Sequence, residues 1–171
     1  MTKNYLAEIE KLIEEKFKGD KKEIQRVLAI NKQLYNNAND TSKDPNATNR
    51  LLEELKSDSP DVLIVKACIG AGAEFEVRDK DGYSSLDYVA KYNLVELAKL
   101  LLLNGGNVHI KDNFNWTPLH TASLYNSFEV AMVLLRYGAD ANAKNKYDST
   151  PYSIAEELKF DKLVQLFKSF K

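Results

Sequence analysis

The chain has 171 residues, which is enough for one domain or a short array of repeats. Its composition is 44% hydrophobic and 29% charged, and its formal net charge of −1 gives no general attraction to nucleic acids or acidic membranes. Apolar runs such as residues 100–103 are too short to cross a bilayer, and the N-terminal residues lack the apolar core of a signal peptide, so we expect a cytoplasmic protein.

The first predicted elements are two amphipathic helices within residues 1–48. Apolar side chains recur at helical spacing over residues 5–17 and again over residues 24–35. Residues 37–48 are polar, contain a proline and predict a loop. The helical pair fits two roles, a cap over the exposed edge of a first repeat or a separate partner-binding hairpin. We favour the cap, because terminal repeats need a covering face.

The next segment, residues 49–83, predicts a second and divergent pair of helices. The first helix is expected over residues 49–57, with Thr48 as its N-terminal cap. The second contains Cys68 and ends at Gly72, where a left-handed residue is commonly needed. Cys68 is the only cysteine, so an internal disulfide is excluded, and on an apolar helical face it is expected to be packed and unreactive.

A constant period of 33 residues organises the rest of the chain. It joins three glycines, three hydroxyl residues and three turn residues: Gly72, Gly105 and Gly138; Ser84, Thr117 and Thr150; Gly82, Asn115 and Asp148. A fixed period of this length indicates stacked units that share a continuous core. Asn and Asp tolerate positive φ better than most residues, so the third set predicts one left-handed backbone position in each unit.

Residues 117–149 form one complete unit. Thr117 and Pro118 are suited to open a first helix, a turn follows at residues 125–127, and a second helix is expected over residues 128–137. Gly138 ends that helix, and an extended stretch leads to the next turn. The preceding unit, residues 84–116, keeps the capping hydroxyl but lacks the proline.

The last unit, residues 150–171, opens with the same Thr-Pro pair. Its second helix carries a polar outer face made of Lys162, Gln165, Lys168 and Lys171. A capping repeat needs such a face, so we expect the array to be complete with about four units.

The stretch Thr117-Pro118-Leu119-His120-Thr121-Ala122 fits the T-P-L-H-x-A signature of ankyrin repeats, and the period of the chain fits their length. Residues 138–142, Gly-Ala-Asp-Ala-Asn, resemble the Gly-Ala-Asp-Val-Asn close of that family, and residues 79–82 resemble its hairpin tip. Over residues 49–171 the chain therefore resembles the ankyrin repeat family. The resemblance implies an all-α solenoid, here with an N-terminal helical cap. The chain departs from the family pattern at Asp87, Ser153, Glu76 and His109.

No pattern of catalytic or metal-binding residues emerges. The resemblance implies that His120 ties neighbouring hairpins by hydrogen bonds, and His109 falls in a hairpin position where we expect it to be exposed. Residues 79–82 look like part of a calcium loop, but Val77 and Tyr88 occupy positions where ligands would be needed. Phosphate-loop and zinc spacings are absent from the sequence. We therefore expect no enzyme, no cofactor and no metal.

The resemblance implies a concave binding face made of hairpin tips and first helices. Mapped onto this sequence, seven of its twelve positions are aromatic: Tyr83, Tyr88, Tyr92, Phe114, Trp116, Tyr125 and Tyr147. Tyr and Trp dominate binding hot spots because they bury a large area at low entropic cost. We predict these seven as partner-binding residues, with Trp116 and Tyr125 as central anchors. The alternative is that Tyr83 and Trp116 pack between hairpins while Tyr92 and Tyr125 stack on neighbouring helices.

The predicted function is binding of a protein partner, without chemistry, by a chain that is monomeric when free. A small inhibitor of the same fold is the alternative, either an immunity protein against a toxin or a secreted effector aimed at a host protein. An enzyme within residues 1–48 is disfavoured because that segment contains no histidine or cysteine. Membranes and nucleic acids are not expected partners, although lysines on the hairpin tips keep nucleic-acid binding as a rival to be tested by its salt dependence.

Overall fold

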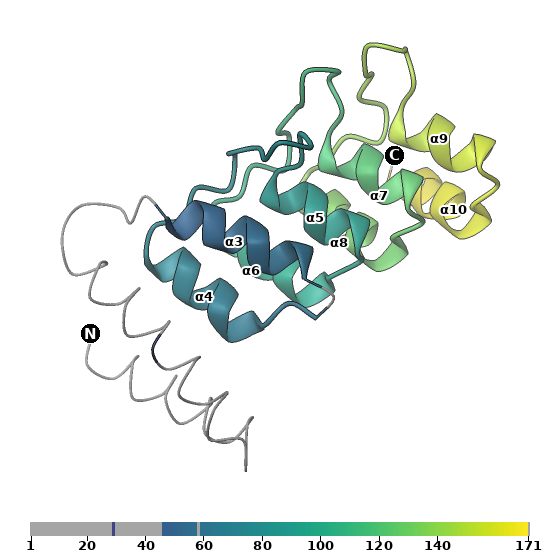
Figure 1. Cartoon of the computed structure of the whole chain (residues 1–171). Helices are drawn as coiled ribbons and strands as arrows, with labels where there is room; N and C mark the ends of the chain where they lie inside the picture. Colours follow the sequence, from purple (N-terminus) through teal and green to yellow (C-terminus); the bar gives the residue numbers. More distant parts are fainter. Residues whose placement is uncertain (1–28, 30–45, 58, 171) are drawn as a thin grey trace. The chain divides into compact units, whose positions relative to one another are not determined.

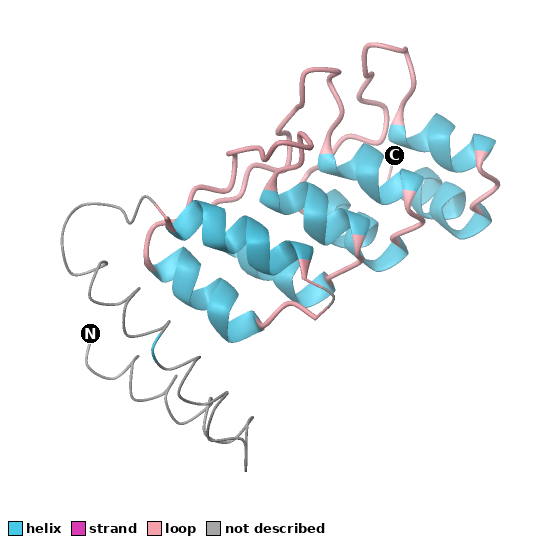
Figure 2. Cartoon of the chain, in the orientation of Figure 1, coloured by secondary structure: helices cyan, strands magenta, loops and turns pink. Residues whose placement is uncertain are grey.

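The computed structural model describes residues 29, 46–57 and 59–170 (Figure 1). It divides into two compact units, residues 1–74 and 75–171. The elements in the described parts are all helices, labelled α3 to α10 (Figure 2). The helical pair predicted for residues 5–35 lies outside the described residues.

In the first unit, α3 (Ala47–Lys56) packs against α4 (Val62–Gly70) through buried aliphatic side chains, and Cys68 is buried as expected. The carboxylate of Asp61 caps α4 by accepting the N–H of Leu63 at 2.8 Å. At the other end, Gly72 has a φ of +83° and the N–H of Ala73 donates to the carbonyl of Cys68. The predicted glycine cap of this helix is therefore confirmed.

The prediction that Thr48 caps the first helix is wrong. α3 begins at Ala47, so Thr48 lies inside its first turn, and the preceding Asn46 makes no side-chain cap. The Thr48 hydroxyl instead accepts the N–H of Glu74 at 2.8 Å. It therefore fastens the segment that follows α4, a role that depends on a residue 26 positions away in the sequence.

The second unit contains three helical pairs, each a short first helix followed by a longer second helix. The first helices are α5 (Ser85–Lys91), α7 (Pro118–Leu124) and α9 (Pro151–Glu157); the second helices are α6 (Val95–Leu103), α8 (Phe128–Arg136) and α10 (Asp161–Ser169). First helices start at residues 85, 118 and 151, which confirms the constant period found in the sequence. Each first helix packs on its own second helix, and α7 packs between α5 and α9, while loops project from one end of the helical layers (Figures 1 and 2).

The core of the second unit consists of aliphatic side chains from both helical layers, closed at the end of the stack by Phe167. Its fully buried members include Leu86, Val89, Leu101, Leu119, Val130, Leu134 and Leu163. On α10 the outer face is polar, and Lys162, Gln165 and Lys168 are exposed as predicted, whereas Lys171 lies outside the described residues. Burial on one face and polarity on the other suit a terminal repeat.

Within the second unit, the backbone is left-handed at corresponding places in each repeat. Gly82, Asn115 and Asp148 have φ of +83°, +61° and +59°, which confirms the predicted shared position in the hairpin turn. A second such position, between first and second helices, was not predicted from the sequence. It is occupied by Asn93, Asn126 and Lys159, with φ of +53°, +55° and +56°.

Candidate functional site

The three hairpins of residues 75–171 are built by one repeated hydrogen-bond pattern. In the central hairpin, Asp112 Oδ1 accepts the N–H of Phe114 at 2.8 Å and that of Trp116 at 2.7 Å. Asp79 and Asn145 accept the equivalent N–H groups in the other two hairpins. These bonds fix the residues two and four positions after the Asp or Asn, and those residues include most of the predicted binding aromatics.

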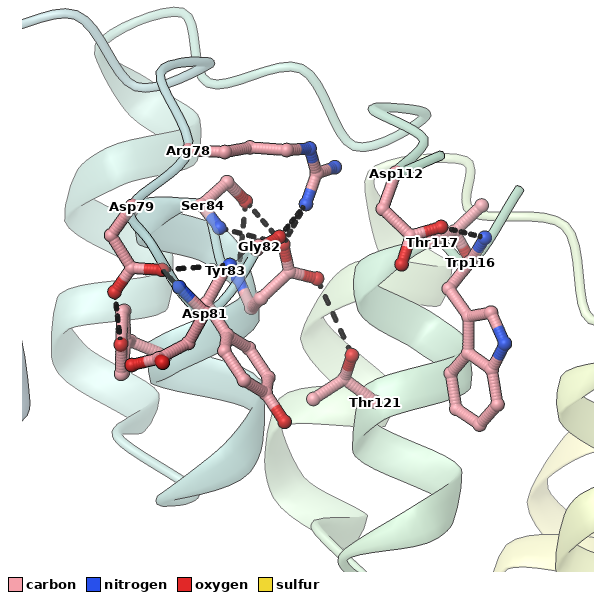
Figure 3. Close-up of polar contacts among 12 residues, drawn as sticks. Arg78, Asp79, Asp81, Gly82, Tyr83, Ser84, Asp112, Trp116, Thr117 and Thr121 are labelled. Atoms are coloured by element: carbon pink, nitrogen blue, oxygen red, sulfur yellow. Dashed lines mark hydrogen bonds and ion pairs between the residues drawn. The ribbon is translucent and has the colours of Figure 1, made fainter. Parts of the chain in front are cut away.

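Below the first hairpin, a buried carboxylate joins two repeats (Figure 3). Asp87 Oδ2 accepts the N–H of Ser84 at 2.9 Å and the Nη1 donor of Arg78 at 2.9 Å. Asp87 Oδ1 accepts the hydroxyl of Thr121, in the next first helix, at 3.3 Å. Arg78 also donates to the carbonyl of Gly82 at 2.6 Å. The ion pair of Arg78 and Asp87 therefore balances the buried negative charge and holds the hairpin on its helix.

His120 makes the equivalent connection one repeat later. Its Nδ1 accepts the N–H of Thr117 at 3.1 Å, so the proton lies on Nε2, which donates to the carbonyl of Ser149 at 3.2 Å. Burial lowers the pKa of His120, which keeps the ring neutral in the folded chain. The tie between hairpins that the family resemblance implied is confirmed, and the ring does not face solvent.

A pocket of about 340 Å³ lies between the hairpins and the first helices of the second unit. Its aromatic lining consists of five of the seven predicted residues: Tyr83, Phe114, Trp116, Tyr125 and Tyr147. Figure 3 shows the Tyr83 and Trp116 rings extending from neighbouring hairpins toward the first helices. The remaining lining residues are Arg78, Asp81, Gly82, Asp87, Asp112, Thr121 and Leu124.

Phe114 and Tyr147 are the most exposed of these aromatic residues. Phe114 is 52% exposed and Tyr147 is 66% exposed, and the rings stack with centroids 6.1 Å apart. The main chains of the two hairpins also meet, since the N–H of Lys146 donates to the carbonyl of Phe114. Trp116 is half-buried, with its ring 5.5 Å from that of His120.

Tyr88 is not part of the surface, which corrects the expectation that all seven aromatic residues are accessible. It is only 3% exposed, and its hydroxyl donates to Asp79 Oδ2. Thr121 and Ile154, at the corresponding position of the other first helices, are buried too. Thr121 contacts the preceding first helix through Asp87, whereas the Tyr88 ring lies beside the rings of Tyr83 and Tyr92 in its own repeat. Burial and the Asp79 carboxylate raise the pKa of Tyr88.

Tyr92 and Tyr125 follow the first helices and are both exposed, although Tyr92 does not line the pocket. The ammonium group of Lys91 lies 5.0 Å from the ring centroid of Tyr83, 5.3 Å from that of Tyr92 and 5.7 Å from that of Tyr125. The hydrogen bond with Tyr125, together with burial, raises the pKa of Tyr83 to about 12. The Tyr83 hydroxyl therefore stays protonated near neutral pH.

Charge is distributed unevenly around the pocket. Lys80, Lys111 and Lys146 are exposed on the hairpin tips, as the sequence indicated. Asp81 and Asp112 instead line the pocket. The sequence alone did not bring these two residues into one pocket with Arg78. The repeated spacing of Asp79, Asp112 and Asn145 is a signal for the turn bonds within each hairpin, but not for the approach of neighbouring hairpins.

Within the described residues, no group of three or more His, Cys, Asp or Glu side chains is arranged to hold a metal ion. His109 is exposed, as expected. A search of the same residues for a bilayer-spanning helix, long and apolar, found none.

Stacked helical pairs that recur at a constant period and are joined by hairpin loops define an all-α repeat protein. A family model described as ankyrin repeats in three copies matches residues 28–145 and 86–167. These matches cover most of the chain, which belongs to the ankyrin repeat family. Ankyrin repeats are generally modules of protein–protein interaction, and the family is typically non-enzymatic. No curated protein matches the sequence.

The match begins at residue 28, inside the segment that sequence analysis assigned to an N-terminal helical pair. The division at residue 48, and the choice between a cap and a second binding site for residues 1–48, stay predictions.

Proposed function

We propose that the chain binds a partner protein, without catalysis, through the hairpin and first-helix face of residues 75–171. The binding residues would be the exposed and half-exposed aromatic residues of this face, here named the aromatic strip: Tyr83, Tyr92, Phe114, Trp116, Tyr125 and Tyr147. Tyr88 is removed from the set because it is buried.

One observation carries the proposal, which is the exposure of the stacked Phe114 and Tyr147 rings. Neither ring belongs to the buried core of the second unit. Single exposed apolar residues are common, but a group of them around a pocket is a feature of interaction surfaces. A partner that covered both rings would remove a large apolar area from water at small entropic cost.

The polar network below the strip supports a preformed surface. The aromatic residues of the tips are fixed by backbone hydrogen bonds to Asp112 and Asn145, and the first hairpin is held by Arg78 and Asp87. A surface that is already ordered loses little conformational freedom on binding, so more of the contact energy appears as affinity.

The test compares two double variants with wild type in affinity capture from the native cell lysate. Phe114→Ala with Tyr147→Ala removes the stacked pair, whereas Leu103→Ala with Tyr137→Ala removes two exposed apolar side chains outside the strip. We expect the first variant to lose a captured protein that wild type and the second variant retain, with unchanged helicity for both. Equal capture by all three proteins would contradict the proposal.

A further inference from the structure

The pocket beneath the aromatic strip carries carboxylates that the fold has not used for pairing. Of its three acidic residues, Asp87 is buried and paired with Arg78 at 2.9 Å. Neither Asp81 nor Asp112 has an ion pair in the described part of the chain. Within the lining itself, two negative charges therefore remain without a counter-charge, although the tips around the pocket carry lysines.

The chain's own Lys91 shows that the rings of this surface attract a cation. Its ammonium group lies over the rings of Tyr83, Tyr92 and Tyr125, with all three centroids in the distance range of cation–π attraction. Lys91 therefore occupies Tyr83 and Tyr92, from the first hairpin and its helix, together with Tyr125 at the end of α7. In the described residues, no cation lies over Phe114, Trp116 or Tyr147.

Asp112 lies in the hairpin that carries two of these three rings. Its Oδ1 accepts the N–H groups of both Phe114 and Trp116, so the carboxylate and the two aromatic residues belong to one turn. Its Oδ2 makes no hydrogen bond in the described part of the chain. A planar guanidinium group can donate to a carboxylate through its edge while its face stacks on an aromatic ring, which an ammonium group cannot do.

Arg78 adds a donor to the same pocket. Its Nη2 is buried and has no hydrogen-bond partner in the described residues, whereas its Nη1 is used by Gly82 and Asp87. A buried donor left without an acceptor is costly, so this part of the pocket wall carries a positive charge that the fold has not fully satisfied. The pocket of about 340 Å³ is at the small end for ligand sites, which suits a single side chain.

We propose that this pocket binds an arginine side chain of the partner protein, paired with Asp112 and Asp81 and stacked on Trp116 and Phe114. The exposed Lys80, Lys111 and Lys146 around it favour acidic residues on either side of that arginine. The inference rests on the proposed function, because it assigns a chemistry to the partner of the same surface.

The experiment selects binders from random peptides displayed on phage, using the full chain as the target and the Phe114→Ala, Tyr147→Ala variant for counter-selection. Selected peptides are synthesised with each arginine intact or replaced by citrulline, which has the same shape but no charge. Binding is followed by the fluorescence of Trp116, the only tryptophan in the chain. We expect an arginine common to the selected peptides, and a loss of about tenfold in affinity with citrulline.

Asp112→Asn tests the carboxylate itself. In the next hairpin, Asn145 accepts the two equivalent N–H groups, those of Tyr147 and Ser149. Asparagine at position 112 should therefore preserve the turn and remove only the charge. We expect this variant to bind the arginine peptide about fivefold more weakly and to lose most of its preference over citrulline. Asp140→Asn is the matched control, since Asp140 makes a similar turn bond to Asn142 outside this pocket.

The outcomes separate the two proposals. Peptides that need Phe114 and Tyr147 but bind equally with citrulline would overturn the arginine site and leave the proposed function standing. An unchanged preference for arginine in Asp112→Asn would overturn the assigned contact. Failure to select any peptide that distinguishes wild type from the counter-selection variant would contradict both.

Discussion

At the third position of each first helix, the second unit carries three different side chains: Asp87, His120 and Ser153. Each accepts the N–H of the residue that precedes its helix, which satisfies one of the free donors at the helix start. Asp87 also binds Thr121 of the next first helix, and His120 also binds Ser149 of the next hairpin. The departure from the family's histidine at Asp87 therefore changes the chemistry of the tie between repeats without removing it.

The Asp87 network gives a prediction for stability. Asp87→Ala leaves the Arg78 guanidinium partly buried without its counter-charge, so we expect a loss of about 3 kcal/mol in the free energy of unfolding, measured with urea. Arg78→Met with Asp87→Ala removes both charges and should cost clearly less. A double variant that is less stable than Asp87→Ala alone would contradict this account of the pair.

His120 predicts a pH dependence. Its pKa is lowered in the folded chain, so the unfolded chain binds more protons as the pH falls below the ordinary value of 6.5. Its contribution to stability is therefore complete above pH 6.5 and declines from there down to the pKa of the folded state. We expect the urea midpoint of wild type to fall between about pH 7.5 and about pH 5.5 by more than that of His120→Gln, where glutamine keeps an acceptor at this position. Parallel pH profiles for the two proteins would refute it.

At the scale of elements, sequence reasoning succeeded where side-chain type reports backbone conformation. The set of Gly82, Asn115 and Asp148 indicated positive φ, because these residue types tolerate it. The second left-handed position was not predicted because lysine, a residue type that does not indicate positive φ, replaces asparagine at position 159 of the last repeat. The roles of Thr48 and Tyr88 were mistaken because each depends on a hydrogen-bond partner that only the fold supplies, the N–H of Glu74 and the carboxylate of Asp79.

Lys159 therefore offers a stabilising substitution. A lysine at a φ of +56° is strained relative to asparagine, and the chain already uses asparagine at the two equivalent positions. We expect Lys159→Asn to raise the free energy of unfolding by about 0.5–1 kcal/mol, measured by urea denaturation. The matched change Lys168→Asn, at an exposed position inside α10, should not stabilise the chain. Equal effects at both sites would count against backbone strain as the cause.

At the scale of the whole molecule, the constant sequence period together with the T-P-L-H-x-A motif was sufficient to predict the family and the repeated helical pairs of the second unit. The family resemblance then placed five aromatic residues that the fold gathers around one pocket. It did not place Arg78, Asp81 and Asp112 there, because residues of neighbouring hairpins approach one another only after the repeats stack. The net charge of −1 also conceals a local separation, with lysines on the tips and carboxylates inside the pocket.

The central claim is that the aromatic strip is the surface that binds the partner protein. Its most direct test is the affinity of the purified captured partner for Phe114→Ala with Tyr147→Ala, measured by calorimetry beside Leu103→Ala with Tyr137→Ala. The account predicts a loss of at least about 30-fold for the first variant and less than about twofold for the second, at equal thermal stability. Similar affinities for the two variants would contradict it and move the binding surface away from the strip.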